Sequence, residues 1–89
     1  MNIYDEIKVE RLSQIKKGWG LEHDDMLVNG QLACAASAYA MEKKELYPSG
    51  WVYKEAPRRK QLIKAAALIV AEIERLDRLG NSMTESYLP

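Results

Sequence analysis

The strongest constraint on the fold of this chain is a segment of roughly 22 residues, from Pro57 to Leu79, that is predicted to form one long helix. Proline suits the first position of a helix, and Gly80 provides a stop after the last turn. Such a helix spans about 33 Å and would be the longest element. Its apolar side chains recur at helical spacing: Leu62, Ala66, Ile69, Ile73 and Leu76. We expect Ile69 and Ile73 to be covered, either by the rest of the domain or by a second subunit.

Two shorter helices are predicted before this segment. The first runs from about residue 3 to residue 17, because Asn2 is a good N-cap and Gly18 can adopt the left-handed conformation that ends a helix. The second runs from about residue 31 to residue 46. Small side chains dominate it and let a neighbouring backbone approach closely, so we expect it to be the central helix.

The length of 89 residues allows one domain and is too short for two. Hydrophobic residues make up 47% of the chain and charged residues 29%, which suffices for a core and a solvated surface. We therefore expect a single all-α domain over residues 1–80, resembling a three-helix bundle, and a mobile tail over residues 81–89. A domain this small buries only about 60 to 65% of its unfolded surface. We expect a homo-oligomer, because self-association would hide part of the remainder.

Charge and cysteine content limit the partners and the compartment. Thirteen basic and thirteen acidic residues cancel, which gives no reason to expect nucleic-acid or membrane binding. The single cysteine, Cys34, cannot form an internal disulfide, and we predict that it lies in the core. The longest apolar stretch, residues 65–71, is far shorter than the roughly 18 residues of a membrane span. We expect a cytoplasmic protein.

Acidic residues and the only histidine cluster before the second helix: Glu22, His23, Asp24 and Asp25. Carboxylate oxygens and imidazole are ligands of divalent cations such as Mg²⁺. A metal site here would need further ligands, and we expect them from Glu10 and Glu72. The alternative is structural, because acids before a helix favour its dipole and Arg75 can pair with Glu72 in place of a metal.

A run of basic residues surrounds the start of the long helix: Lys54, Arg58, Arg59, Lys60 and Lys64. Cations at a helix N-terminus oppose the helix dipole, so this placement breaks the local rule. Arginine side chains and free N–H groups there would hold a phosphate or an acidic protein surface. The alternative is a solvated face balanced by Glu55 and neighbouring acids.

The loop of residues 47–53 contains Pro48 and Gly50 but also three aromatic side chains: Tyr47, Trp51 and Tyr53. A nucleobase could stack on these rings, or the rings could pack against the domain's own core. In a nucleotide complex, the arginines would hold phosphate, a ring would stack on the base, and polar groups would form the floor. The predicted ligand-binding residues are Arg58, Arg59, Lys64, Trp51, Tyr53, Glu72, His23 and Asp24.

We find no set of catalytic residues in the sequence. There is no phosphate-binding Walker loop, no dinucleotide-binding glycine pattern and no pair of histidines with zinc-ligand spacing. A pair between Cys34 and His23 has no motif behind it. We therefore expect binding rather than catalysis.

Three motifs resemble a family of small accessory proteins encoded by tailed phages and prophages. They are ERxxQ at residues 10–14, GWxxEHDD at residues 18–25 and AAALIVAEIERLDR at residues 65–78, and the resemblance covers roughly residues 8–79. It implies a phage protein of the host cytoplasm that acts by binding. Such a protein could counter host defence by sequestering a nucleotide signal or by blocking a defence protein.

A fainter likeness is to the all-α nucleotide pyrophosphohydrolases of the MazG type, which hold magnesium with two pairs of carboxylates. In the register that fits best, Tyr39, Lys64 and Ala67 occupy the positions of those carboxylates. The likeness therefore implies a binding descendant that has lost catalysis. Two alternatives remain: a magnesium-dependent nucleotide hydrolase that uses Glu10, Asp24, Asp25 and Glu72, and a structural or scaffold module.

Overall fold

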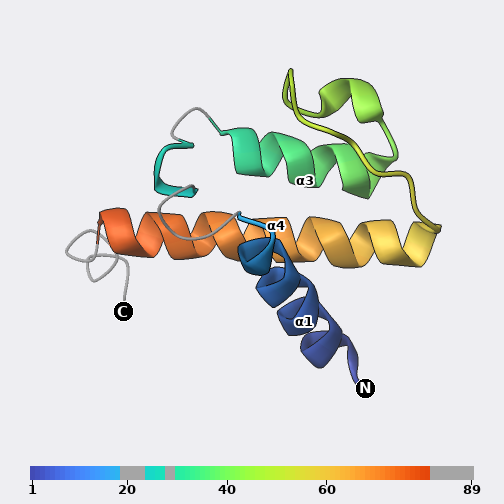
Figure 1. Ribbon diagram of the computed structural model, residues 1–89, viewed down its shortest axis with the longest axis horizontal. Coiled ribbons are helices and arrows are strands. Elements are labelled where there is room, and N and C mark those ends of the chain that lie inside the picture. Colours follow the sequence, from blue (N-terminus) through green and yellow to red (C-terminus); the bar gives the residue numbers. More distant parts are fainter. Residues whose placement is uncertain (19–23, 28–29, 81–89) are drawn as a thin grey trace, which may run out of the picture.

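The computed structural model describes residues 1–18, 24–27 and 30–80, and three α-helices dominate these ranges (Figure 1). They are α1 (Ile3–Lys16), α3 (Gln31–Met41) and α4 (Arg58–Leu79), with a short 3₁₀ helix η1 (Lys44–Leu46) after α3. The described ranges contain no strand. The all-α, three-helix prediction is confirmed, whereas the predicted tail over residues 81–89 lies outside the described residues.

The helix ends follow local chemistry. The side chain of Asn2 accepts a hydrogen bond from the backbone N–H of Asp5 at 2.8 Å, so the predicted N-cap of α1 is confirmed. Gly18 has a φ of 98° just after α1 ends, as expected for a left-handed terminating residue. The second helix is shorter than predicted. It ends at Met41 because Glu42 adopts the left-handed conformation with φ 56°, and no glycine or proline marks this stop in the sequence.

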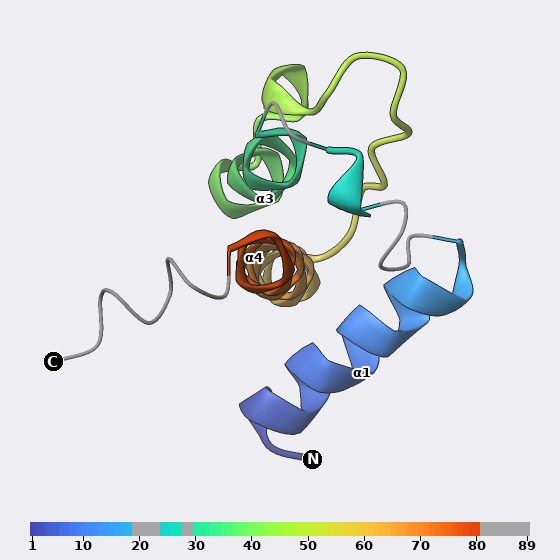
Figure 2. The same ribbon diagram turned by 90° about the vertical axis from the view of Figure 1, so that its left-hand side faces the viewer.

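Helices α3 and α4 run antiparallel and pack along a seam of small side chains (Figures 1 and 2). The buried cluster at this seam consists of Leu32, Ala35, Ala36, Tyr39, Ala65, Leu68 and Ala71. Alanine has no side chain beyond Cβ, so the two backbones can approach closely. The prediction of a close approach is therefore confirmed.

Helix α4, and not α3, is the central element. It packs against α3 on one side and against α1, which crosses it obliquely, on another (Figure 2). Helix α3 keeps one face in solvent. Cys34 lies on that exposed face, so the prediction that it belongs to the core is wrong.

The predicted apolar stripe of α4 is not covered by the other described helices. Leu62, Ile69, Ile73 and Leu76 are 45%, 43%, 52% and 48% exposed. The residues that α4 buries are Gln61, Ile63, Ala65, Ala67, Leu68, Ala71 and Arg75. The expectation that the domain itself covers the stripe is wrong, because α4 is apolar on more than one face and close helix packing selects its alanines over its larger side chains.

Helix α1 contributes mainly charged residues to its contact with α4. The residues that it buries are Glu10 and Arg11, whereas Ile3, Val9 and Leu12 are exposed. None of the described helices combines the length and apolar content needed to cross a lipid bilayer.

Candidate functional site

The four carboxylates proposed as metal ligands each bind a cationic side chain. Glu10 accepts from Lys60 at 2.8 Å and from Lys64 at 3.2 Å, Asp24 accepts from Arg11 at 2.7 Å, Asp25 accepts from Arg78 at 2.8 Å, and Glu72 accepts from Arg75 at 2.7 Å. In the described ranges, no three His, Cys, Asp or Glu side chains come together as metal ligands would. Glu22 and His23 lie outside those ranges. In the described part of the chain these four carboxylates are therefore partners of cationic side chains, and the structural pairing of Glu72 with Arg75 is confirmed.

Glu10 lies almost fully buried between α1 and α4. Burial by itself would raise the pKa of its carboxyl group, since a low-dielectric environment disfavours the charged form. The hydrogen bonds and positive charges of Lys60 and Lys64 outweigh burial and lower the pKa below its ordinary value of 4.5. Glu10 is therefore a charged anchor that holds α1 against α4.

Arg11 and Asp24 form the most deeply buried ion pair among the described residues. Arg11 is 5% exposed and Asp24 is 0% exposed. The Nε atom of Arg11 also donates a hydrogen bond to the carboxylate of Glu74 at 3.0 Å. This arginine connects α1, the helical turn that contains Asp24 and the last third of α4. Sequence analysis missed this role of Arg11 and Glu74, because no local pattern distinguishes a buried arginine from a solvated one on a charged helix.

Four side chains of the basic run each bind a group within the chain: Arg58, Arg59, Lys60 and Lys64. Arg58 donates to the backbone carbonyl oxygens of Tyr39 and Ala40. These carbonyls lie in the last turn of α3, where a cation is favoured by the helix dipole. The guanidinium of Arg58 is therefore unfavourable for the dipole of α4 but favourable for the dipole of α3.

Arg59 forms two hydrogen bonds to the carboxylate of Glu6, at 2.7 and 2.6 Å. These bonds raise the pKa of the Arg59 guanidinium and lower the pKa of the Glu6 carboxyl. A phosphate at Arg58 and Arg59 would compete with the α3 carbonyls and Glu6 for these guanidinium groups.

The three rings of the 47–53 loop fold back onto the domain. Tyr53 stacks on Tyr39 with ring centroids 4.7 Å apart, and Tyr47 meets Tyr39, Tyr53 and Trp51 edge to face. The Tyr39 hydroxyl accepts a hydrogen bond from the backbone N–H of Lys54 at 3.1 Å. Burial, and then the nearby Tyr39 hydroxyl, raise the pKa of Tyr47 well above its ordinary value. The interpretation that the rings pack against the domain's own core is confirmed.

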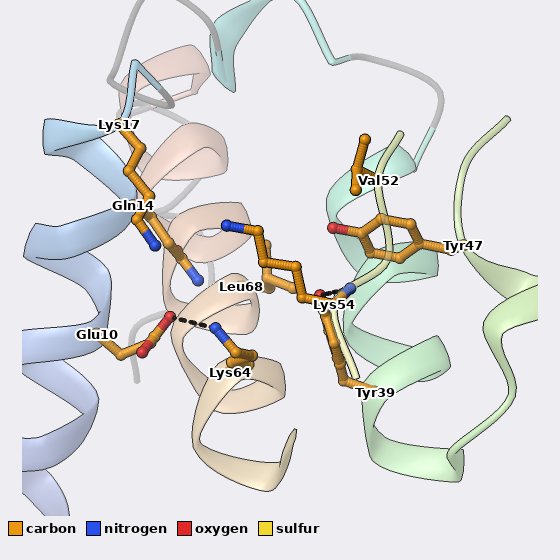
Figure 3. Close-up of a pocket in the computed structure, with 9 residues that line it drawn as sticks. All are labelled: Glu10, Gln14, Lys17, Tyr39, Tyr47, Val52, Lys54, Lys64 and Leu68. Carbon is orange, nitrogen blue, oxygen red and sulfur yellow. Dashed lines mark hydrogen bonds and ion pairs between the residues drawn. The ribbon is translucent and has the colours of Figure 1, made fainter. Parts of the chain in front are cut away.

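One cavity, of about 80 Å³, lies between α1, α3, the 47–54 segment and α4 (Figure 3). Its polar lining consists of Glu10, Gln14, Lys17, Lys54 and Lys64, and its apolar lining consists of Tyr39, Tyr47, Val52 and Leu68. Among the predicted ligand-binding residues that the structure describes, only Lys64 lines it, and His23 lies outside the described ranges. Gln14 and Lys17 had no predicted role, and the signal that could have found them is their spacing of four and seven residues from Glu10, which places all three on one side of α1.

Comparison with known proteins gives no relative from which a function could be transferred. No family model matches the chain, and neither a curated protein nor a solved structure matches it. Function must therefore be argued from the chain's own surfaces.

Proposed function

We propose that the protein acts by binding other protein chains, and that its first partner is a second copy of itself. The observation that carries this proposal is the exposed apolar stripe of α4, defined by Leu62, Ala66, Ile69, Ile73 and Leu76. A contiguous apolar patch on a small protein commonly marks an interaction surface. We refer to these five residues as the α4 stripe.

The α4 stripe has the spacing of a helix-pairing seam. Its members are separated by four, three, four and three residues, which is the a/d pattern of helices that pack side by side. The pattern is nearly symmetric about Ile69, because Leu62 and Leu76 each lie seven residues away. In an antiparallel pair, Leu62 would meet Leu76 of the second copy, and the small Ala66 would lie beside Ile73. The stripe is therefore complementary to itself.

Charge favours the antiparallel orientation. The first half of α4, residues 58–68, carries four basic residues and no acidic one, whereas residues 69–79 carry three acidic and two basic residues. Antiparallel pairing places the basic half of one copy beside the acidic half of the other. Parallel pairing would place the two basic halves together, at a cost in repulsion.

A second apolar surface borders the stripe. Tyr4, Leu12 and Ile15 of α1 and Val70 of α4 line a shallow groove between the two helices. Val70 is three residues from Ile73 and four from Ala66, so it is a neighbour of both on the helix surface. A dimer that also buries this groove would hide more apolar area than one that pairs the α4 helices alone.

The resemblance to phage accessory proteins gives this binding module a role, in which the homo-oligomer counters host defence in the cytoplasm of the infected cell. Blocking a host protein fits an apolar surface better than sequestering a nucleotide does. Arg58 and Arg59, the residues proposed to hold phosphate, are engaged with α3 and Glu6. A magnesium-dependent hydrolase has less support, because its four proposed carboxylates are paired with lysine or arginine.

Sedimentation equilibrium over about 1 to 100 μM protein tests the proposal, since weak dimers have dissociation constants in this range. We expect the wild-type chain to be a dimer and Ile69→Glu to be a monomer, because the substitution places two carboxylates together at the symmetric centre. Ile69 is 43% exposed in the single chain, so the variant should keep its helical circular dichroism spectrum.

The matched control is Met41→Glu, which adds the same charge at a 55% exposed apolar residue of α3. This variant should remain a dimer. A wild-type chain that stays monomeric at every concentration would contradict self-association. A dimer that Ile69→Glu and Met41→Glu weaken equally would place the interface elsewhere.

A further inference from the structure

We propose that the cavity between α1, α3 and the 47–54 segment binds a small anion, namely a carboxylate or phosphate group joined to a short apolar or planar body. This proposal is independent of self-association. The cavity uses Lys64 and Leu68 of α4, which lie on a different side of the helix from Ile69 and Ile73.

The first observation is an excess of positive charge around the cavity. Lys17 follows the end of α1, Lys54 belongs to the segment after the aromatic loop, and Lys64 belongs to α4, so three separate parts of the chain supply ammonium groups. The side chains of Lys17 and Lys54 extend into the same space from opposite sides (Figure 3). Charges of the same sign that converge on one space repel each other, and a bound anion would relieve that repulsion.

Glu10 is the only acidic group that the described residues contribute to the lining, and it is already neutralised. Both carboxylate oxygens of Glu10 accept hydrogen bonds, one from Lys60 and one from Lys64. In the described ranges, the ammonium groups of Lys17 and Lys54 form no ion pair or hydrogen bond. These two side chains are therefore available to an external anion.

The second observation is a buried amide oxygen that lacks a hydrogen-bond partner. The Oε1 atom of Gln14 is inaccessible to solvent and unpaired within the described structure. A buried polar atom without a partner is costly, so a ligand that draws the Gln14 amide toward the cavity and pairs with it is favoured. Because an amide presents either its oxygen or its NH₂ group after a half-turn, Gln14 can accept from a ligand hydroxyl or donate to a ligand oxygen.

The remaining walls of the cavity set the class of ligand. Leu68 is 4% exposed and forms an apolar wall, and the ring of Tyr47 faces the same space (Figure 3). Val52, which is 74% exposed, stands at the rim. A volume of about 80 Å³ accommodates an anionic head group. It is far smaller than the roughly 300 to 1,000 Å³ of pockets that enclose drug-sized ligands, so a whole nucleotide would not be enclosed.

Titration of ¹⁵N-labelled full-length protein at low salt tests this site, with phenyl phosphate and benzoate as probes. Benzamide has the same ring without the charge and serves as the uncharged comparison. We expect phenyl phosphate or benzoate to shift the backbone amide signals of residues 14–17 and 52–54 with saturation. Tighter binding of one of the two identifies the preferred head group. Equal binding of benzamide would overturn the anion requirement.

Two double variants separate a specific site from general attraction. Lys17→Gln with Lys54→Gln should weaken binding at least about tenfold, because it removes both available charged donors. Lys16→Gln with Lys44→Gln removes the same net charge at exposed positions that do not line the cavity, and it should stay within about twofold of wild type. Equal losses in both double variants, or no saturable shift with either anion, would overturn the proposal.

A single variant checks the location without removing a lysine. Val52→Glu places a carboxylate at the exposed rim beside Lys54, where it competes with the anion for the same ammonium groups. Because Val52 is largely in solvent, the fold should be retained, as the dispersion of the amide signals would show. Unchanged binding of phenyl phosphate and benzoate by this variant would place their site elsewhere on the surface.

Discussion

Helix α4 contacts its two neighbours by different means. Against α3 it places alanines and Leu68, and the buried cluster at that seam contains no charged residue. Against α1 it places two lysines, one arginine and Glu74, which pair with Glu10, Glu6 and Arg11. One interface is therefore formed largely by apolar packing and the other largely by ion pairs.

This difference predicts different responses to mutation and to solvent. Apolar burial is non-directional and hardly depends on pH, but a close-packed seam tolerates little added volume. Ion pairs require particular partners and protonation states, and exposed pairs contribute little to stability. We therefore expect α3 and α4 to form the stable unit and α1 to be the helix that is released first.

The largest expected effect is the loss of the buried charge at the α1 interface. Asp24→Ala removes the carboxylate that pairs with the buried Arg11 guanidinium, and breaking a buried pair typically costs about 3 to 5 kcal/mol. Urea denaturation should show this loss in the free energy of unfolding. Glu6→Gln, which breaks the exposed pair with Arg59, is the control and should leave the midpoint close to wild type. Similar midpoints for the two variants would show that the Arg11–Asp24 pair is not an anchor.

A smaller effect is expected from added volume in the seam. Ala71 is fully buried between α3 and α4, and Ala71→Leu should destabilise the chain by about 1 to 3 kcal/mol through overpacking. Ala33→Leu makes the same change on the exposed face of α3 and should be nearly neutral. If Ala71→Leu were as stable as wild type, the seam would have room that close packing does not leave.

The smallest effect concerns the loss of stability at acidic pH. The pKa of Glu10 is lowered in the folded chain, so its contribution to stability is present above its ordinary pKa of 4.5 and is lost as the pH falls through the lowered value. Glu10→Gln should flatten the decline of melting temperature below about pH 5. Lys60→Gln should flatten it less, because Lys64 remains bonded to Glu10. If the melting temperature of Glu10→Gln declined at low pH as that of the wild type does, the carboxylate would not be held by these lysines.

The sequence was sufficient to predict elements whose signals are local. The Asn2 cap, the stop at Gly18 and the long helix that ends before Gly80 all depend on residues within one or two turns. The early end of α3 at Glu42 was missed, because a glutamate carries no signal for a left-handed conformation. The packing of the aromatic loop against the core was one of the two arrangements that the sequence allowed.

The candidate site was less predictable because its partners come from distant segments. Glu10 and Glu72 were proposed from the sequence as metal ligands, but whether they form a metal site or structural ion pairs depends on cationic partners from elsewhere in the fold. The lysine cavity was not predicted, since Lys17, Lys54 and Lys64 converge only after three segments pack together. The α4 stripe was identified from the sequence. Its exposure to solvent was not predictable, because it depends on which face of α4 packs against α3.

The most direct test of the contrast between the two interfaces is native-state hydrogen exchange, measured for each backbone amide at neutral pH. We predict that the amides of α1 exchange through openings of lower free energy than those of residues 32–39 and 63–71, and that Glu10→Gln lowers only the α1 values. Equal opening free energies for α1 and α4, with α1 unaffected by Glu10→Gln, would contradict a helix held by ion pairs on a packed two-helix unit.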